Sequence, residues 1–265
     1  MLDIRSLTKI FATQPQKAAL NGLNLQVQKG EFVTVLGSNG AGKSTLFHAI
    51  AGEFFPDEGQ ILLEGKNITF QAAHQRSRFI GRVMQDPMKG TVPAMTVAEN
   101  LALAEHKGIK GKKLFSSITK SQKEQFQEKL ALLGLGMEDK LEQPVGLLSG
   151  GQRQALTLLM ATFQQPKLLL LDEHTAALDP ATAEKVMQLT QAVIEQHNIT
   201  TLMITHNLAH SLAFGNRTIL MDKGKIVMDV QGDQRKAYTP QLLMEQFHQL
   251  AGEETTTSQQ SFALL

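Results

Sequence analysis

The feature that most constrains this chain is a glycine-rich turn between a buried strand and a helix. Residues 31–36 (EFVTVL) have the continuous apolar pattern of a buried strand, and residues 46–51 continue with helical character. Between them, residues 37–44 have the spacing G-x-x-x-x-G-K-S of a P-loop. Glycines permit positive φ and close backbone approach, so successive N–H groups can surround a phosphate. The pattern predicts an α/β fold that holds a phosphate at this turn, and the alternative is a glycine-rich turn that binds nothing.

The residues of this loop have separate expected roles. Lys43 adds a mobile charge for the β- and γ-phosphates, and the Ser44 hydroxyl is an oxygen ligand for Mg²⁺. The helix that starts near Lys43 points its positive end at the anion. The predicted nucleotide contacts of this segment are Gly37, Ser38, Asn39, Gly40, Ala41, Gly42, Lys43, Ser44 and Thr45.

A second candidate site follows the leucine run at residues 168–171, which ends in Asp172 and Glu173. The run predicts a buried strand, so Asp172 stands at the carboxyl edge of the sheet, where open α/β sheets bind ligands. We expect Asp172 to contribute to the Mg²⁺ shell and Glu173 to accept a proton from an attacking water. The alternative is a strand end without chemistry.

The composition excludes several classes of protein. The chain has no cysteine, which excludes disulfides, thiolate zinc sites and cysteine nucleophiles. A formal net charge of +1, no tryptophan and a single tyrosine argue against nucleic-acid binding. The apolar runs are far shorter than the ~20 residues that cross a bilayer, and the start does not resemble a signal peptide. We expect a soluble chain, with any membrane spans supplied by other subunits.

Strand and helix patterns divide the chain. We predict an α/β core at residues 1–86 and 161–250, a helical subdomain at 87–160 and a tail at 251–265. Expected elements are half-buried strands at 4–7 and 20–27, strands at 59–63, 79–84 and 200–205, helices at 149–164, 180–197 and 240–250, a hairpin turn at 223–224, and a solvated loop at 107–113. Capping boxes are predicted at Thr96–Glu99 and Ser121–Glu124.

A third motif, LSGGQ at residues 148–152, stands at a predicted helix start and offers N–H groups and a hydroxyl to a phosphate. With these three motifs in order, the chain resembles the ATP-binding cassette ATPases, the nucleotide-binding subunits of ABC transporters, over residues 2–250. The resemblance implies a P-loop NTPase core with a mixed sheet, an antiparallel β subdomain and an inserted α-helical subdomain. It also implies that Ser149, Gly150, Gly151 and Gln152 contact the ATP of a partner protomer.

The same resemblance implies roles for four further residues. Phe11 resembles the aromatic that stacks on adenine, although it has the alternative of an ordinary core aromatic. Gln85 resembles the glutamine that senses Mg²⁺ and the γ-phosphate, with a surface amide as the alternative. His206 resembles the switch histidine, with a satisfied side chain at a strand end as the alternative. Asp179 resembles the aspartate of the D-loop.

Two positions depart from the commonest family pattern. His174-Thr175-Ala176 stands where most members have Pro-Thr-Ser. His174 either alters the environment of Glu173 or occupies a solvent-facing turn. Phe11 stands where tyrosine is common, which keeps stacking and loses a hydroxyl.

The implied assembly is a homodimer that holds two ATP molecules with Mg²⁺ at its interface, on the cytoplasmic face of a bacterial membrane. Lys43, Gln85, Glu173 and His206 are the implied catalytic residues. The implied partners are integral membrane permease subunits and, in an importer, an extracytoplasmic substrate-binding protein. Residues 86–95 are expected to form part of the groove for a coupling helix of the permease, and the alternative is that their methionines pack inside the subdomain.

The transported substrate is inferred from resemblance only. Residues 80–91 and 172–180 resemble an importer group assigned to tryptophan and tyrosine, and residues 95–101 also resemble ATPases of branched-chain amino-acid importers. The alternatives are the ATPase of an exporter or of an importer for another small nutrient. A soluble cassette that acts on ribosomes or DNA and a catalytically inactive module are less favoured, because the chain has one cassette and intact motifs.

Overall fold

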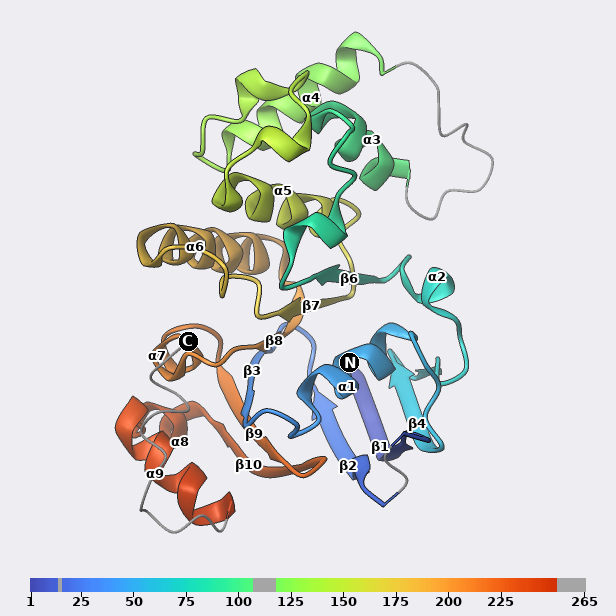
Figure 1. Cartoon of the computed structure of the whole chain (residues 1–265), viewed down its shortest axis with the longest axis vertical. Coiled ribbons are helices and arrows are strands. Elements are labelled where there is room, and N and C mark those ends of the chain that lie inside the picture. Colours follow the sequence, from blue (N-terminus) through green and yellow to red (C-terminus); the bar gives the residue numbers. More distant parts are fainter. Residues whose placement is uncertain (14–15, 107–117, 252–265) are drawn as a thin grey trace. The chain divides into compact units, whose positions relative to one another are not determined.

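The computed structural model describes residues 1–13, 16–106 and 118–251 (Figure 1). The chain forms two compact units, Met1–Arg76 with Asn198–Leu265 and Ser77–His197. The loop predicted at 107–113 and the tail predicted beyond residue 251 lie outside the described residues. Within the described ranges, no helix has the length and apolar character that a membrane span requires.

The first unit contains an antiparallel sheet with the strand order β2-β1-β4-β5. Its strands are β1 (Leu2–Ile10), β2 (Ala18–Val27), β4 (Glu58–Leu63) and β5 (Lys66–Asn67). Leu2, Ile4 and Leu7 of β1 are buried and most residues between them are not, which confirms the predicted half-buried strand.

The same unit contains the strands that carry the P-loop. β3 (Phe32–Gly37) pairs in parallel with both β8 (Thr200–Ile204) and β9 (Arg217–Asp222), and β10 (Lys225–Gln231) returns antiparallel to β9. Every residue of β3 and β8 is buried, as the continuous apolar patterns predict for a parallel sheet covered on both faces. The predicted hairpin turn is confirmed by the positive φ of Lys223 and Gly224.

The helices of this unit are α1 (Lys43–Ala51), α2 (Ala73–Arg76), α7 (Leu208–Ala213), α8 (Gly232–Lys236) and α9 (Pro240–Ala251). On α9, Leu243 and Phe247 pack against Leu36 of β3 and Leu220 of β9, so the last helix supports the strand that leads into the P-loop. Sequence patterns did not predict α2, α7 or α8, because each is six residues or shorter.

A fully buried arginine ties α1 to α2. Arg76 donates to the carbonyls of Ala49, Ile50, Thr69 and Gln71 at 2.7–2.8 Å. Two of these carbonyls, those of Ala49 and Ile50, belong to the last turn of α1, where Ala49 O also accepts from Gly52 N at 3.2 Å. Burial lowers the pKa of Arg76 to about 10, so the guanidinium is still charged at neutral pH and needs these acceptors.

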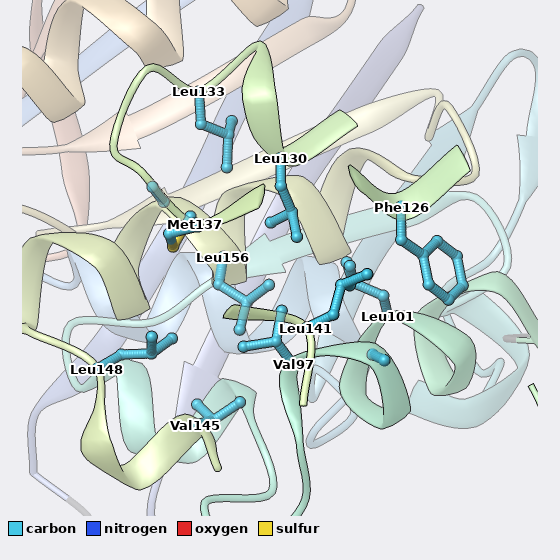
Figure 2. Packing of buried hydrophobic residues seen from close by; sticks show 12 residues of the cluster. Val97, Leu101, Phe126, Leu130, Leu133, Met137, Leu141, Val145, Leu148 and Leu156 are labelled. Carbon is cyan, nitrogen blue, oxygen red and sulfur yellow. The ribbon is translucent and has the colours of Figure 1, made fainter. Parts of the chain in front are cut away.

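The second unit pairs β6 (Ile80–Val83) in parallel with β7 (Leu168–Asp172). Its helices are the short turns at Pro87–Gly90, Glu138–Lys140 and Val145–Leu147, and α3 (Val97–His106), α4 (Lys120–Ala131), α5 (Gly150–Thr162) and α6 (Pro180–His197). Figure 2 shows buried side chains of α3, α4, α5 and the connection between α4 and α5 gathered in one cluster. Phe126, Leu130 and Leu133 belong to this cluster, as the spacing on one helical face predicts.

The two predicted capping boxes had different outcomes. The box of Thr96 and Glu99 is confirmed at the start of α3. The box of Ser121 and Glu124 is wrong, because Thr119 and Gln122 form the box and α4 begins two residues earlier. Both pairs have the required spacing. Ile118, just before the observed cap, packs against the buried cluster, and this contact favours the earlier start.

The predicted α/β fold with a mixed sheet and several helices is confirmed. The compact unit Ser77–His197 includes β6, β7 and α6 together with the helices of the predicted subdomain. The predicted boundaries of the helical subdomain at residues 87 and 160 stay a prediction.

Candidate active site

The P-loop backbone has a shape that only glycine adopts readily. Gly37, Gly40 and Gly42 have φ of 148°, 80° and 102°. A Cβ on Gly42 would lie 2.5 Å from the carbonyl oxygen of Ala19, and one on Gly37 would collide with the carbonyl oxygen of Met221. The loop therefore lies directly against neighbouring backbone, and its glycines are required for this path.

Lys43 lies across the loop. Its Nζ donates to the carbonyls of Gly37 (2.7 Å) and Ser38 (3.0 Å), and its side chain is buried. α1 begins at Lys43 with Gly42 as its N-cap and no side-chain cap hydrogen bond, which is the arrangement that favours an anion at a helix start. Asn39, Gly40 and Ser44 are exposed, whereas Ser38 and Thr45 are half-buried and Ala41 is buried.

The β9–β10 hairpin holds the P-loop from outside the motif. Gly224 N donates to the carbonyl of Ala41 at 2.9 Å, and a Cβ on Gly224 would lie 2.9 Å from Ala19 O. The sequence predicted this turn but not its contact, because a hairpin pattern carries no information about what its tip touches.

His206 lies at the edge of the sheet where the P-loop begins. It follows β8, which pairs with β3, and Thr205 N donates to Val35 O at 3.3 Å. Asn207 then caps α7 by accepting from His210 N at 2.9 Å. The half-buried His206 is therefore held between a paired strand and a capped helix, close to the carboxyl ends of these parallel strands.

Phe11 is exposed over 36 % of its surface, so the core alternative is wrong. Its ring meets that of Phe54 edge-to-face, with centroids 5.4 Å apart. An accessible ring held by a neighbour is suited to stacking on a planar ligand.

In the second unit, β7 ends at Asp172, and a basic side chain on the adjacent strand faces it. Arg82 Nη2 of β6 lies 3.7 Å from Asp172 Oδ2, and both side chains are largely buried. Burial lowers the pKa of Arg82, and the charge of Asp172 acts against this shift. Sequence reasoning missed this ion pair. The arginine within the otherwise apolar strand pattern of residues 79–84 is an unusual feature, but it does not identify Asp172 as the partner.

Glu173 has φ of 46°, a left-handed conformation that is uncommon for a residue with a side chain. It starts the turn after β7, in which Ala176 N donates to Glu173 O at 3.0 Å. Conformations of this kind gather at functional sites, because the surrounding structure must hold them in place.

His174 is buried, with 2 % of its surface exposed, so the solvent-facing alternative is wrong. Its Nε2 lies 3.1 Å from Thr190 Oγ1 on α6, and that hydroxyl donates to Val186 O at 2.7 Å. Since the hydroxyl hydrogen is used there, His174 Nε2 is the donor to Thr190. The turn at Glu173 directs the next side chain inward, which a sequence pattern does not reveal.

Gln85 is exposed and lies two residues beyond β6. Asp179 accepts from Thr182 N at 3.1 Å and so caps the first turn of α6. Hydrogen bonds from Thr182 lower the pKa of Asp179. Asp179 therefore has a structural role whether or not it contacts a nucleotide.

The LSGGQ motif begins α5 with a capping box. Ser149 Oγ accepts from Gln152 N at 3.2 Å, and Gln152 Oε1 accepts from Ser149 N at 3.3 Å. Gln152 Nε2 also donates to Leu135 O at 3.0 Å. Ser149 and Gly150 are exposed at the helix start, whereas the amide of Gln152 is occupied by contacts within the chain.

Gly151 is required for the packing of α5 on α6. A Cβ there would collide with Thr182 Cγ2, and Thr182 is held by its hydrogen bonds to Asp179. We expect Gly151→Ala to lower the free energy of unfolding by about 1–3 kcal/mol, because it overpacks this contact. Urea unfolding of the full chain measures the effect.

Two further variants test this explanation. Thr182→Ser keeps the hydroxyl and removes Cγ2, so the double variant should regain the stability lost in Gly151→Ala. Gly150→Ala is the matched control, because its Cβ meets only the flexible end of Leu178 at 3.2 Å. Equal stability of Gly151→Ala and the parent chain would contradict the proposed collision.

The residues predicted for Mg²⁺ have suitable chemistry. Ser44, Gln85 and Asp172 offer hydroxyl, amide and carboxylate oxygens, and Mg²⁺ in nucleotide sites takes one or two such ligands together with phosphate and water. No cluster of three or more histidine or acidic side chains suited to a metal occurs in residues 1–13, 16–106 and 118–251.

Comparisons with known proteins place these motifs in one family. The family described as ABC transporter matches residues 20–176. A tyrosine transport ATP-binding protein of Clostridioides difficile is 42 % identical over 251 residues, covering 93 % of this chain and 98 % of that protein. A xylose/arabinose import ATP-binding protein of Sulfolobus acidocaldarius is 35 % identical over 228 residues, covering 86 % of each chain.

Solved structures agree with this assignment. The ADP conformation of MJ1267, an ATP-binding cassette of an ABC transporter, has a TM-score of 0.78 at 28 % identity and covers 96 % of this chain and 99 % of that chain. A dimeric post-hydrolysis state of the cassette MJ0796, bound to ADP and Pi, has a TM-score of 0.74 at 28 % identity and covers 87 % of this chain and 98 % of that chain. The chain therefore belongs to the ATP-binding cassette family and is an ATP-hydrolysing subunit of an ABC transporter.

Proposed function

We propose that this ATPase powers the import of an aromatic amino acid of the tryptophan/tyrosine class. The observation that carries the proposal is the 42 % identity to a tyrosine transport protein along 98 % of that protein's length. Relatives with sugar, spermidine/putrescine and bicarbonate transport functions are 32–35 % identical, which supports the aromatic amino acid over those cargoes.

At the ATP site, Lys43 and the N–H groups of residues 37–45 hold the phosphates, and Phe11 stacks on the base. Ser44, Gln85 and Asp172 hold Mg²⁺, which supplies charge neutralisation at the transferring phosphate. Glu173 accepts the proton of the attacking water, and His206 contacts the γ-phosphate. The collisions that a side chain at Gly37 or Gly42 would cause support a close backbone cradle for this anion.

The working form is a homodimer in which residues 149–152 and Asp179 of one protomer complete the ATP site of the other. The exposed Ser149 and Gly150 at the start of α5 support this role, as does the dimeric structure of a related cassette. A two-fold assembly of this type uses the same surface on each protomer.

The permease contact is proposed at the turn Pro87–Gly90 and its surroundings, on the cytoplasmic face of the membrane. Met88 and Val92 are exposed, which disfavours the alternative that Met88 packs inside. Leu147 is 71 % exposed and directly follows Gly146, whose N–H donates to Pro93 O at 2.9 Å. Exposed apolar side chains gathered on a tied loop suit a partner helix. An extracytoplasmic substrate-binding protein completes the proposed importer.

Uptake of labelled amino acids tests the cargo. Cells that lack the native gene and redundant transporters are complemented with the parent chain or with Glu173→Gln, and tryptophan, tyrosine and leucine uptake are compared. We expect selective loss of tyrosine or tryptophan uptake with the mutant chain present at the membrane. Unchanged uptake of all three would reject the amino-acid proposal, and loss of leucine uptake alone would reject the aromatic class.

A further inference from the structure

The end of β1 is tied to the segment Phe54–Asp57 by charged groups. Lys9 Nζ donates to Phe55 O at 3.0 Å and to Asp57 Oδ1 at 2.9 Å. Ile10 N donates to Asp57 Oδ2 at 2.7 Å, and Asp57 N donates to Thr8 O at 2.9 Å. The Asp57 carboxylate, through both of its oxygens, and the Lys9 ammonium thus tie the chain immediately before Phe11 to the segment Phe54–Asp57.

The same ammonium lies beside two aromatic rings. Lys9 Nζ is 5.6 Å from the ring centroid of Phe11 and 5.5 Å from that of Phe54. The two rings have an interplanar angle of 82° with centroids 5.4 Å apart, which is an edge-to-face pair. Cation–π contacts act within about 6 Å, so all three groups hold one another in place.

Phe11 needs such support because it stands beyond the last hydrogen-bonded residue of β1 and is exposed. An exposed side chain on free backbone samples several rotamers, and ordering it on binding costs affinity. The hydrogen bonds from Ile10 N and Lys9 lower the pKa of Asp57, because they stabilise its charged form.

We propose that Phe54, Lys9 and Asp57 are positioning residues that hold the Phe11 ring as a preformed stacking surface for the base of the nucleotide. This inference rests on the proposed function, in which Phe11 stacks on adenine. The three residues act through Phe11, so they contribute to binding of the base and not to binding of the phosphates.

Calorimetric titration of the full chain with ATP and with inorganic tripolyphosphate tests the proposal. Phe54→Leu should weaken ATP binding by about three- to tenfold, the order expected for losing one aromatic pair, and leave tripolyphosphate binding unchanged. Phe54→Tyr keeps the ring and should bind ATP like the parent chain. Asp57→Ala, at a partly exposed position, should reproduce the ATP-selective loss without touching either ring.

Combination with Phe11→Ala shows whether the effect passes through Phe11. We expect Phe11→Ala/Phe54→Leu to bind ATP as weakly as Phe11→Ala alone, because the supported ring is already missing. Phe70→Leu is the matched control: Phe70 is 72 % exposed and forms an edge-to-face pair with Phe55 that does not include Phe11. It should leave both ligands unaffected.

Three results overturn the inference: unchanged ATP affinity in Phe54→Leu, equal losses for ATP and tripolyphosphate, or additive losses in the double variant. Failure of the proposed function would give a different experimental result. In that case the parent chain itself does not bind ATP, or Phe11→Ala binds ATP as well as the parent does.

Discussion

We expect Glu173→Gln to lower the rate of ATP hydrolysis by about 10²–10⁴-fold, the usual contribution of a general base, and to leave ATP binding intact. The amide has the shape of the carboxylate but accepts no proton from water at neutral pH. Glu173 has a left-handed backbone with φ of 46°, and glutamine has the same size and branching as glutamate. The substitution is therefore expected to leave the backbone conformation at this position unchanged. Because the bound ATP is not hydrolysed, the ATP-bound homodimer should accumulate in this variant.

Phosphate release and size-exclusion chromatography with ATP measure the two effects. Glu184→Gln is the matched control, because Glu184 is an exposed glutamate on α6 of the same unit. It should hydrolyse ATP at the parent rate and show no trapped dimer. Near-parental hydrolysis by Glu173→Gln would show that Glu173 is not the general base and that another group accepts the proton from water.

We expect Lys43→Met to weaken ATP binding by about 10- to 150-fold, the range that corresponds to losing about 1.5–3 kcal/mol for a hydrogen bond to a charged group. Methionine fills a similar volume and has no charge. The buried ammonium of Lys43 donates to Gly37 O and Ser38 O, so the loop is expected to keep its glycine-determined path with somewhat less order. The loss should appear in binding more than in folding.

Thermal unfolding with and without ATP separates these contributions. A ligand that binds only the folded chain raises its melting temperature, so at one ATP concentration the shift produced by ATP should be smaller in Lys43→Met than in the parent chain. Lys185→Met, at an exposed position on α6, is the control and should keep the full shift. A full ATP-induced shift in Lys43→Met would contradict a phosphate contact for Lys43.

The elements with strong periodicity were predictable. The buried strands β3, β7 and β8 appear as continuous apolar runs, and the helix at 180–197 has the predicted bounds. Helices of six residues or fewer, such as α2 and α7, were missed, because one or two helical turns contain too few residues to show a period. The start of α4 was placed two residues late, because two overlapping segments satisfy the same capping pattern.

Residues alone determined the family, the α/β fold and the identity of the candidate site residues, because local spacing in the P-loop, the acidic strand end and the LSGGQ motif has direct chemical meaning. The tertiary structure alone decided which groups support them. The burial of His174 against Thr190, the pairing of Arg82 with Asp172 and the contact of Gly224 with Ala41 join segments that are distant in sequence. Such contacts depend on strand register and helix packing, and no local pattern encodes them.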